Sequence, residues 1–357
     1  MRKLRLLIAF ILFCAGFGYL LLQVQKEKSP TLLPLKKPSV QIAGSPVQIS
    51  QRSIFVPSWT LDESLSSAQY DRFIYFGVTG GSGGIVTDDE AYNNIENFIE
   101  SVPPSAKKLL TVKMTNSSAN LGILKNKEAQ QSIIKDSISI ATENGFNGIV
   151  FDFELFSLFD DSVPGNINIF VENFYSEAKN NNLHFAMTIY GDVYFRQRPY
   201  DLDFLGKHTD EIMVMAYDLH KSIGEPGPNF PLSGGKKFGY DFASMIGDYK
   251  KFIEPEKLTV LFGMYGYDWI VDEKKRPIRQ AKALSLNQIK NTYLDKCGKT
   301  NCVPFRDKES TENEINYVEN DVYHIIWFED EESVRQKTEF LKENGIGSIG
   351  FWAFGYF

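Results

Sequence analysis

Short apolar runs recur along the chain from Ser53 onward, separated by longer stretches in which apolar and polar residues mix. The runs are nearly continuous in hydrophobicity rather than strictly alternating. That pattern is typical of strands covered on both faces, as in a parallel sheet. It predicts eight strands: SIFVPSW (53–59), RFIYFGV (72–78), KLLTVKM (108–114), GIVFDFE (148–154), LHFAMTIY (183–190), EIMVMAY (211–217), LTVLFGMY (258–265) and IGSIGFWAF (346–354).

The stretches between the runs carry helical patterns. Residues 127–145 place Ile133, Ser137 and Ala141 on one face and end in Asn-Gly, which is a helix stop signal, and residues 331–345 end in the same way. A strand followed by a helix, eight times over about 300 residues, predicts a (β/α)₈ TIM barrel of the α/β class. An open, doubly wound sheet is the alternative, because periodicity alone does not separate the two.

Two segments depart from this alternation of strand and helix. About 80 residues separate the seventh and eighth runs, more than one helix requires. We expect a small α+β insertion there, at about 270–328, that contains CGKTNC (297–302) and a strand-like segment at 320–330. The glycine-rich stretch 77–85 lacks the Lys-Ser/Thr pair of a phosphate-binding loop, and we interpret it as a flexible loop after the second strand.

The N-terminus predicts a membrane anchor. No charge lies between Arg5 and Lys26, and this segment is long enough to span a bilayer. Basic residues before it place the N-terminus in the cytosol and the rest of the chain outside. We favour a transmembrane helix at 1–25; the alternative is a cleaved signal peptide, which would make the protein secreted. Residues 26–52, with four prolines, read as an extended linker to a domain at 53–357.

Composition narrows the classes of partner. The net charge is −7 and no Lys/Arg-rich block follows the N-terminal segment, so nucleic acid is not an expected partner. None of the four histidines has metal-ligand spacing, so neither a metal nor a cofactor is expected. Cys297 and Cys302 are spaced for a disulfide in an oxidising compartment, with two free thiols as the alternative.

The fourth run carries two carboxylates inside an apolar segment. Asp152 and Glu154 face the same way, about 6.6 Å apart along the strand, with Val150 beneath them. The C-terminal ends of barrel strands form the rim of the active site. A carboxylate beside another resists ionisation, so one of the pair can stay protonated near neutral pH and act as a general acid. Two solvated acids at an ordinary strand end are the alternative for an isolated D-x-E.

The run GFNGIVFDFE resembles the signature D-x-x-D-x-D-x-E of glycoside hydrolase family 18, the chitinase family. Asp152 and Glu154 match its last Asp and its catalytic Glu, whereas Asn147 and Val150 replace the first and middle Asp. Three further segments resemble family motifs in the expected order. The pattern of these motifs is most similar to the spore-cortex and cell-wall N-acetylglucosaminidase branch of the family. These segments are MAYD (215–218), MYGYDW (264–269) and WFEDEESVRQK…GIGSIGFWAFG (327–355).

The resemblance implies retaining, substrate-assisted hydrolysis of β-linked N-acetylglucosamine glycans, either peptidoglycan or a chitin-like polymer. Glu154 would protonate the leaving oxygen while the acetamido oxygen of the sugar attacks the anomeric carbon. Asp152 would hold the acetamido N–H, and Tyr217 would donate to the acetamido oxygen.

The same resemblance assigns the substrate-binding residues. Asp218 and Met215 would line the subsite, Trp352 would form its floor, and Tyr265 and Trp269 are candidates for neighbouring subsites. Two other functions remain open. One is a catalytically weak or inactive, lectin-like barrel, which Val150 favours; the other is an α/β hydrolase, disfavoured because no G-x-S-x-G is present.

Overall fold

The computed structural model describes residues 46–357, apart from 62–64, 66–68, 157–159, 295–296 and 298–301. The chain divides into two units, Met1–Gly44 and Ser45–Phe357, and every described residue belongs to the second. The expected anchor at 1–25 and most of the expected linker lie outside the described residues. Within the described ranges, no helix has both the length and the apolar character needed to cross a membrane.

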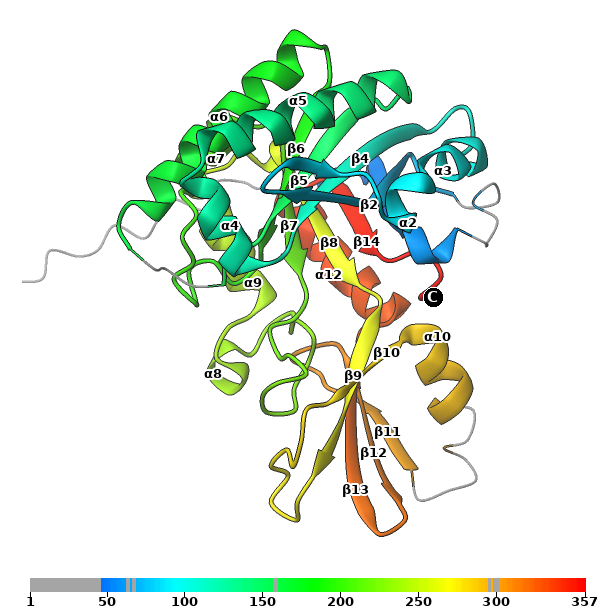
Figure 1. Cartoon of the computed structure of the whole chain (residues 1–357). Helices are drawn as coiled ribbons and strands as arrows, with labels where there is room; N and C mark the ends of the chain where they lie inside the picture. The colour runs from blue at the N-terminus through cyan, green and yellow to red at the C-terminus, as the bar shows by residue number, and fades with distance from the viewer. Residues whose placement is uncertain (1–45, 62–64, 66–68, 157–159, 295–296, 298–301) are drawn as a thin grey trace, which may run out of the picture. The chain divides into compact units, whose positions relative to one another are not determined.

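Eight parallel strands close into a barrel (Figure 1). Around the barrel their order is β1-β2-β4-β5-β6-β7-β8-β14, and β14 pairs with β1 to complete the ring. The predicted TIM barrel is therefore confirmed, and the open sheet is excluded. The strands are β1 (Gln51–Pro57), β2 (Arg72–Gly81), β4 (Lys107–Met114), β5 (Gly148–Phe153), β6 (His184–Tyr190), β7 (Glu211–Ala216), β8 (Leu258–Gly263) and β14 (Ser348–Trp352).

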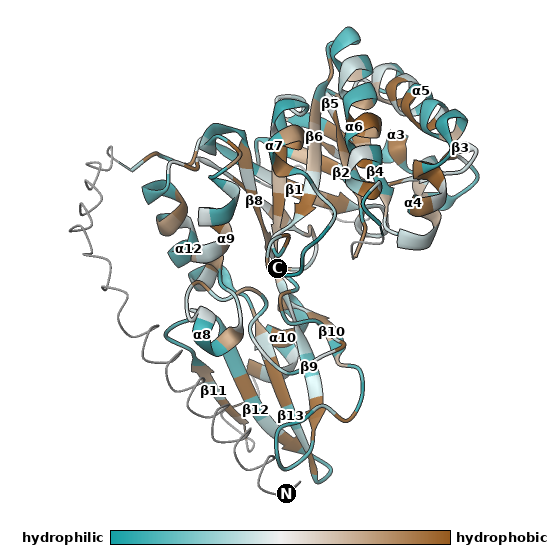
Figure 2. Ribbon diagram, turned by 90° about the vertical axis from the view of Figure 1, so that its left-hand side faces the viewer, coloured by the Kyte–Doolittle hydropathy of each residue, from teal (hydrophilic) through white to brown (hydrophobic). Residues whose placement is uncertain are grey.

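Helices follow most of these strands, and Figure 2 shows that apolar residues concentrate on the strands while the helices carry hydrophilic residues on one face. Between β1 and β2, the described residues contain the 3-10 turn η1 (Ser58–Thr60). The other segments are α2 (Glu90–Asn93), α3 (Ile95–Ser101), α4 (Ser117–Leu124), α5 (Lys127–Glu143), α6 (Val163–Asn180), α7 (Leu202–Lys207), α8 (Gly235–Phe238), α9 (Phe242–Tyr249), η2 (Pro255–Lys257) and α12 (Glu331–Glu343).

The two helices expected from sequence form at the expected places, as α5 and α12. At the start of α5 the Asn126 side chain accepts a hydrogen bond from a backbone N–H of the first turn, and Asp330 does the same for α12. After each helix the chain turns at a glycine with positive φ, Gly145 (66°) and Gly345 (80°). These residues are the Asn-Gly stop signals in the sequence.

The interpretation of residues 77–85 as a flexible loop is wrong. Strand β2 continues to Gly81 and pairs in antiparallel fashion with β3 (Gly84–Val86) to form a hairpin. Gly84 has φ of 113°, a backbone conformation that residues with a side chain rarely adopt. Glycines contribute nothing to a hydrophobic pattern, so the sequence concealed this short strand.

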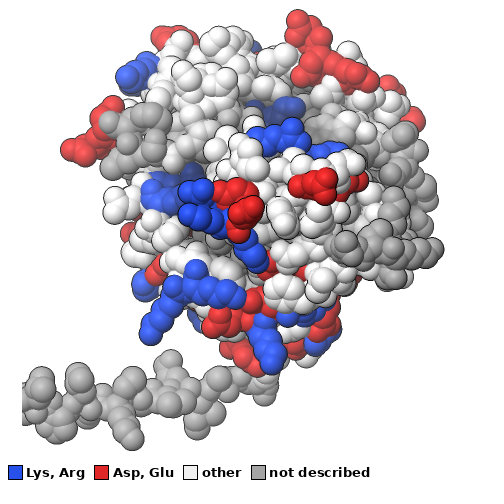
Figure 3. All heavy atoms as spheres, turned by 90° about the horizontal axis from the view of Figure 1, so that it is seen from below, with Lys and Arg blue, Asp and Glu red and all other residues white. Residues whose placement is uncertain are grey.

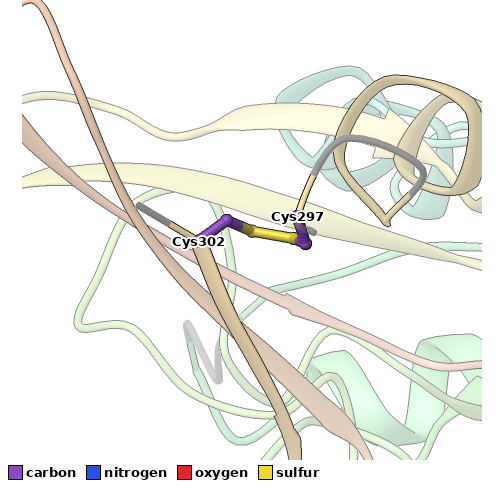
Figure 4. The surroundings of a disulfide bond; sticks show 2 residues. All are labelled: Cys297 and Cys302. Atoms are coloured by element: carbon purple, nitrogen blue, oxygen red, sulfur yellow. A yellow bond between two sulfur atoms is a disulfide. The ribbon is translucent and has the colours of Figure 1, made fainter. Parts of the chain in front are cut away.

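The insertion between β8 and α12 forms a second, antiparallel sheet of five strands in the order β10-β9-β13-β12-β11. It begins at Tyr265, before the expected boundary near 270, because only Met264 separates β8 from β9. A disulfide joins Cys297 and Cys302, whose Cα atoms lie 4.7 Å apart (Figure 4). The segments are β9 (Tyr265–Val271), β10 (Lys282–Ser285), α10 (Leu286–Ile289), the π-helical turn η3 (Lys290–Leu294), β11 (Cys302–Arg306), β12 (Asn313–Glu319) and β13 (Val322–Phe328).

A fully buried lysine connects the insertion to the barrel. Lys337 of α12 lies 2.8 Å from the Glu312 carboxylate and also donates to Glu329, and all three side chains are inaccessible to solvent. Glu312 additionally accepts hydrogen bonds from the backbone N–H groups of Asn229 (2.5 Å) and Phe230 (2.8 Å), in the segment after β7. Burial raises the pKa of Glu329 to about 8, which favours the protonated form of this carboxyl at neutral pH, and Glu329 lacks the two backbone donors that Glu312 has.

This asymmetry predicts different costs for two similar substitutions. Glu312→Gln disrupts the group that accepts from Lys337 and from two backbone donors, and it is expected to destabilise the protein by about 3 kcal/mol or more. Glu329→Gln replaces a neutral carboxyl with a neutral amide and should cost less than about 1 kcal/mol. Urea unfolding at pH 7 measures both free energies of unfolding. Equal losses for the two variants would contradict this difference between the two carboxyl groups.

Candidate active site

The orientation of side chains along β5 places the two acids. Phe151 and Phe153 point out of the barrel and pack against α6, where the rings of Phe151 and Phe170 have centroids 5.1 Å apart. Asp152, between them, points to the other face and lines an internal cleft. Val150 lies one step further down on the same face and is fully buried.

The cleft has a volume of about 730 Å³ and lies where the barrel strands end. It brings together seven of the eight residues that the sequence proposed for catalysis and substrate binding: Asp152, Glu154, Met215, Tyr217, Asp218, Tyr265 and Trp352. Trp269 does not belong to it. That side chain is fully buried within the second sheet, beside the Tyr267 ring, so its suggested role in sugar binding is wrong.

Asp152 is buried, with only 4% of its surface exposed, and it accepts a hydrogen bond from the Thr188 hydroxyl on β6. Burial raises the pKa of Asp152 to about 8, and the negative charge of Glu154 acts in the same direction. The Thr188 hydrogen bond and the charge of Lys113 oppose this rise without cancelling it. Asp152 and Glu154 therefore share a proton near neutral pH, and Asp152 is the ionised member of the pair when Glu154 carries that proton.

Glu154 follows β5 directly and is held by its own backbone. Its N–H donates to the carbonyl of Met114 (2.8 Å), and its carbonyl accepts from the Asn120 side chain (2.8 Å). The Tyr190 hydroxyl donates to its carboxylate. Burial raises the pKa of Glu154, while the Tyr190 hydrogen bond and the charge of Lys221 lower it. The carboxyl group is thus positioned by β4 and β6 and biased toward its protonated form.

Asp218 occupies an unusual backbone conformation, with φ of 61°. Its N–H donates to the side-chain oxygen of Asn229 at 2.7 Å, which holds this conformation. Its carboxylate accepts hydrogen bonds from the hydroxyls of Tyr265 (2.5 Å) and Tyr267 (2.7 Å), both on β9. The second sheet therefore supplies part of the cleft.

Tyr217 lies between these groups, with its ring edge-on to that of Tyr265 at a centroid distance of 6.0 Å. Burial raises the pKa of Tyr217 well above its usual range, and the charges of Asp152 and Asp218 add to this effect. The phenol therefore keeps its proton. No described residue forms a hydrogen bond with its hydroxyl, which leaves that donor available to a molecule in the cleft.

An aromatic wall closes one side of the cleft. The ring of Trp352, at the end of β14, meets that of Phe76 edge-on at 4.7 Å and that of Phe55 at 5.9 Å. Trp59, after β1, extends the wall with 57% of its surface exposed. Flat aromatic faces of this kind suit the apolar faces of sugar rings.

Sequence reasoning missed the residues that position the acids. Thr188 and Tyr190 lie two apart at the end of β6, with the same spacing as Asp152 and Glu154 on the neighbouring strand. That spacing, in polar residues at the end of an apolar run, is the signal that was available. In the described ranges, no group of His, Cys, Asp and Glu is arranged to hold a metal ion.

Two curated Bacillus proteins are similar to this chain in sequence. The chain is 27% identical over 241 residues to the uncharacterized glycosylase YvbX of Bacillus subtilis, covering 65% of this chain and 64% of that protein. It is 28% identical over 251 residues to the cortical fragment-lytic enzyme of Bacillus anthracis, covering 67% of this chain and 54% of that protein. The chain thus matches between about half and two thirds of the length of these curated relatives.

Solved structures share the fold. The spore cortex-lytic enzyme SleL of Bacillus cereus superposes with a TM-score of 0.70 at 23% identity, covering 88% of this chain and 72% of that one. The class V chitinase of Nicotiana tobaccum gives 0.73 at 16% identity, covering 85% of this chain and 93% of that one. The family model for glycosyl hydrolases family 18 matches residues 52–356, nearly all of the described part of the chain. The chain therefore belongs to glycosyl hydrolases family 18.

Proposed function

We propose that this protein hydrolyses β-linked N-acetylglucosamine glycans, of the peptidoglycan or chitin type, with retention of configuration at the anomeric carbon. The observation that carries this proposal is the convergence of Asp152, Glu154 and Tyr217 beneath an aromatic wall in one cleft. The sugar itself supplies the nucleophile, as in the substrate-assisted exception to the two-carboxylate scheme.

In the first step Glu154 donates its proton to the glycosidic oxygen as the bond to the anomeric carbon breaks. The acetamido oxygen of the same sugar forms a new bond to that carbon, which gives a cyclic oxazolinium ion. Water, giving its proton to the Glu154 carboxylate, then opens this ring from the face the leaving group occupied. The raised pKa of Glu154 suits this exchange, because the group starts protonated and recovers its proton at the end.

Asp152 and Tyr217 orient the acetamido group. The Asp152 carboxylate would accept the amide N–H, and its negative charge would offset the positive charge that develops on the oxazolinium ring. Tyr217, whose hydroxyl has no partner among the described residues, would donate to the acetamido oxygen. Met215 and Asp218 would line this subsite, Trp352 would form its floor, and Tyr265 would border the next sugar.

Val150 replaces a carboxylate that the family motif places below Asp152. In this barrel the hydrogen bond to Asp152 comes from the side, from the Thr188 hydroxyl on β6. A neutral donor there favours the ionised form of Asp152 without adding a second negative charge. This arrangement supports catalysis rather than a purely lectin-like role.

The proposal also includes a location outside the cytoplasm, with the N-terminal segment as a membrane anchor or a signal. The disulfide between Cys297 and Cys302 supports an oxidising compartment. Residues 1–25 remain a prediction from sequence.

Glu154→Gln tests the proton donor. Loss of general acid catalysis should lower kcat/KM on N-acetylated glycan about 10²- to 10⁴-fold, while the melting temperature and glycan binding are retained. Mass spectrometry of the released sugars, after incubation with peptidoglycan and with chitin oligomers, measures turnover. Glu177→Gln, at an exposed position on α6, is the matched control. Native protein that binds these glycans without cleaving them would instead support the lectin-like function.

Tyr190→Phe should move the pH profile. The Tyr190 hydroxyl donates to Glu154 and lowers its pKa, so removing the hydroxyl raises the pKa of the proton donor. The alkaline limb of the kcat profile should shift to higher pH, as measured by steady-state assays across the pH range. Tyr194→Phe, at an exposed ring, should leave the limb in place. A shift in the opposite direction would rule out Glu154 as the group that titrates there.

Asp152→Asn should increase stability while it reduces activity. With a native pKa of about 8 against an ordinary value of 3.8, the native carboxyl keeps a proton that the unfolded chain has lost. This group therefore makes folding progressively less favourable as the pH rises from about 4 to about 8. The gain in free energy of unfolding, measured by urea denaturation, should grow across this window; a gain independent of pH would contradict the raised pKa. Asp203→Asn, at an exposed carboxylate, serves as the control.

A further inference from the structure

A second hollow, of about 410 Å³, adjoins the catalytic cleft. Phe156 and Lys221 line both cavities, so the two lie side by side. Beyond them the hollow is bordered by Phe195, Arg196 and Ile223, and both Phe195 and Ile223 expose a large part of their apolar surface. The proposed reaction above gives this space no role.

The order of the barrel strands places the hollow across the cleft from the aromatic wall. Trp352, Phe55 and Phe76 come from β14, β1 and β2, which are neighbours in the ring. The hollow is built from the segments that follow β5, β6 and β7, which form the opposite arc of the ring. A glycan that lies on Trp352 and passes Glu154 is therefore directed toward the hollow.

Lys221 is the cation at the junction of the two cavities. Its ammonium nitrogen lies 5.6 Å from the centre of the Phe156 ring and 5.7 Å from that of Tyr190, the residue that donates to Glu154. Among the described residues, no carboxylate pairs with it. A lysine that faces aromatic rings and forms no salt bridge is well placed to bind an anionic group of a ligand.

The remaining charges of the hollow are already paired. Arg196 and Arg198 both bind the buried carboxylate of Asp192, and Arg196 also donates to the carbonyl of Leu219 at 2.7 Å. The exposed Glu225 at the rim balances the remaining positive charge of these two guanidinium groups and one carboxylate, so Lys221 gives the hollow its net positive charge. The chain as a whole carries a net charge of −7, and Figure 3 shows acidic and basic side chains interspersed on the face it presents. The positive character is thus local to this arc of the cleft.

We propose that the hollow is a subsite for a sugar that bears a carboxylate, specifically an N-acetylhexosamine with a lactyl ether at its 3-oxygen. Lys221 binds the lactyl carboxylate, and the rings of Phe156 and Phe195 pack against the lactyl methyl group and the sugar. This inference rests on the proposed function and deepens it: the preferred substrate is the carboxylated glycan of peptidoglycan rather than neutral chitin.

Lys221 also acts on Glu154 through its charge, and the experiment must separate the two effects. A change in the ionisation of the proton donor alters the turnover of every glycan by the same factor. A contact with a lactyl carboxylate alters only the substrate that carries it. The ratio of kcat/KM for the two substrates therefore isolates the contact.

The test compares two soluble oligosaccharides of equal length, a chitin oligomer and an alternating oligomer in which every second sugar carries the 3-O-lactyl group. The native protein is expected to favour the lactyl oligomer, and Lys221→Gln should lower the ratio of kcat/KM, lactyl over neutral, about tenfold. Lys221→Arg, which keeps the charge, should restore most of the ratio. Lys236→Gln, at an exposed lysine of α8, should leave it unchanged. Melting temperatures confirm that each variant is folded.

Each other outcome has a distinct meaning. An equal loss on both substrates would overturn the subsite, because Lys221 would then act only on Glu154. Native protein that cleaves the chitin oligomer faster would also overturn the subsite while leaving the proposed function intact. If neither oligomer is cleaved, the proposed function fails, and calorimetric binding of the same two oligomers decides the subsite: equal affinities would overturn it.

Discussion

The two-residue alternation of side chains along one barrel strand determines where the chemistry of this protein lies. On β5 the outward positions hold Phe151 and Phe153, whose rings are fixed between α6 and the sheet. The inward positions hold Val150 and Asp152, with Glu154 continuing the line at the rim. A shift in register by one residue would expose the phenylalanines to the barrel interior and send the acids into the helix layer. The packing of two aromatic side chains on one face thus fixes the acids on the other.

The pKa values of buried carboxyl groups shift in opposite directions at the two ends of the barrel. Near the start of the strands, Arg72 of β2 binds Glu211 of β7 through two hydrogen bonds, at 2.5 and 2.7 Å, and this positive charge outweighs burial and lowers the pKa of Glu211. At the other end Asp152 accepts a hydrogen bond from the neutral hydroxyl of Thr188, and burial raises its pKa. One end therefore holds an ion pair that links strands on opposite sides of the barrel. The other keeps acids whose protons are available, as catalysis at that end of a barrel requires.

Features set by residues within one strand or helix could be predicted from sequence. Features that depend on contacts between separate segments could not. The eight apolar runs, the inward pair Asp152 and Glu154, and the caps of α5 and α12 are local patterns. The hydroxyl donors Thr188 and Tyr190 depend on which strand pairs with β5. The burial of Trp269 within the second sheet depends on how that sheet folds, and the hairpin β2–β3 is hidden by glycines that carry no pattern. The family resemblance supplied Tyr217, Asp218 and Trp352, which no periodicity would have selected.

The second sheet is part of the site rather than an addition to it. A continuous series of hydrogen bonds runs from Lys337 to Glu312, from Glu312 to the backbone of Asn229, and from the Asn229 side chain to the N–H of Asp218. Asp218 has a backbone conformation that costs about 1–3 kcal/mol and persists only where its surroundings hold it. Two tyrosines of β9 then bind its carboxylate from the side of the insertion. Because α12, the insertion and the segment after β7 all contribute to this series, the geometry of the cleft depends on contacts that lie outside the barrel strands themselves.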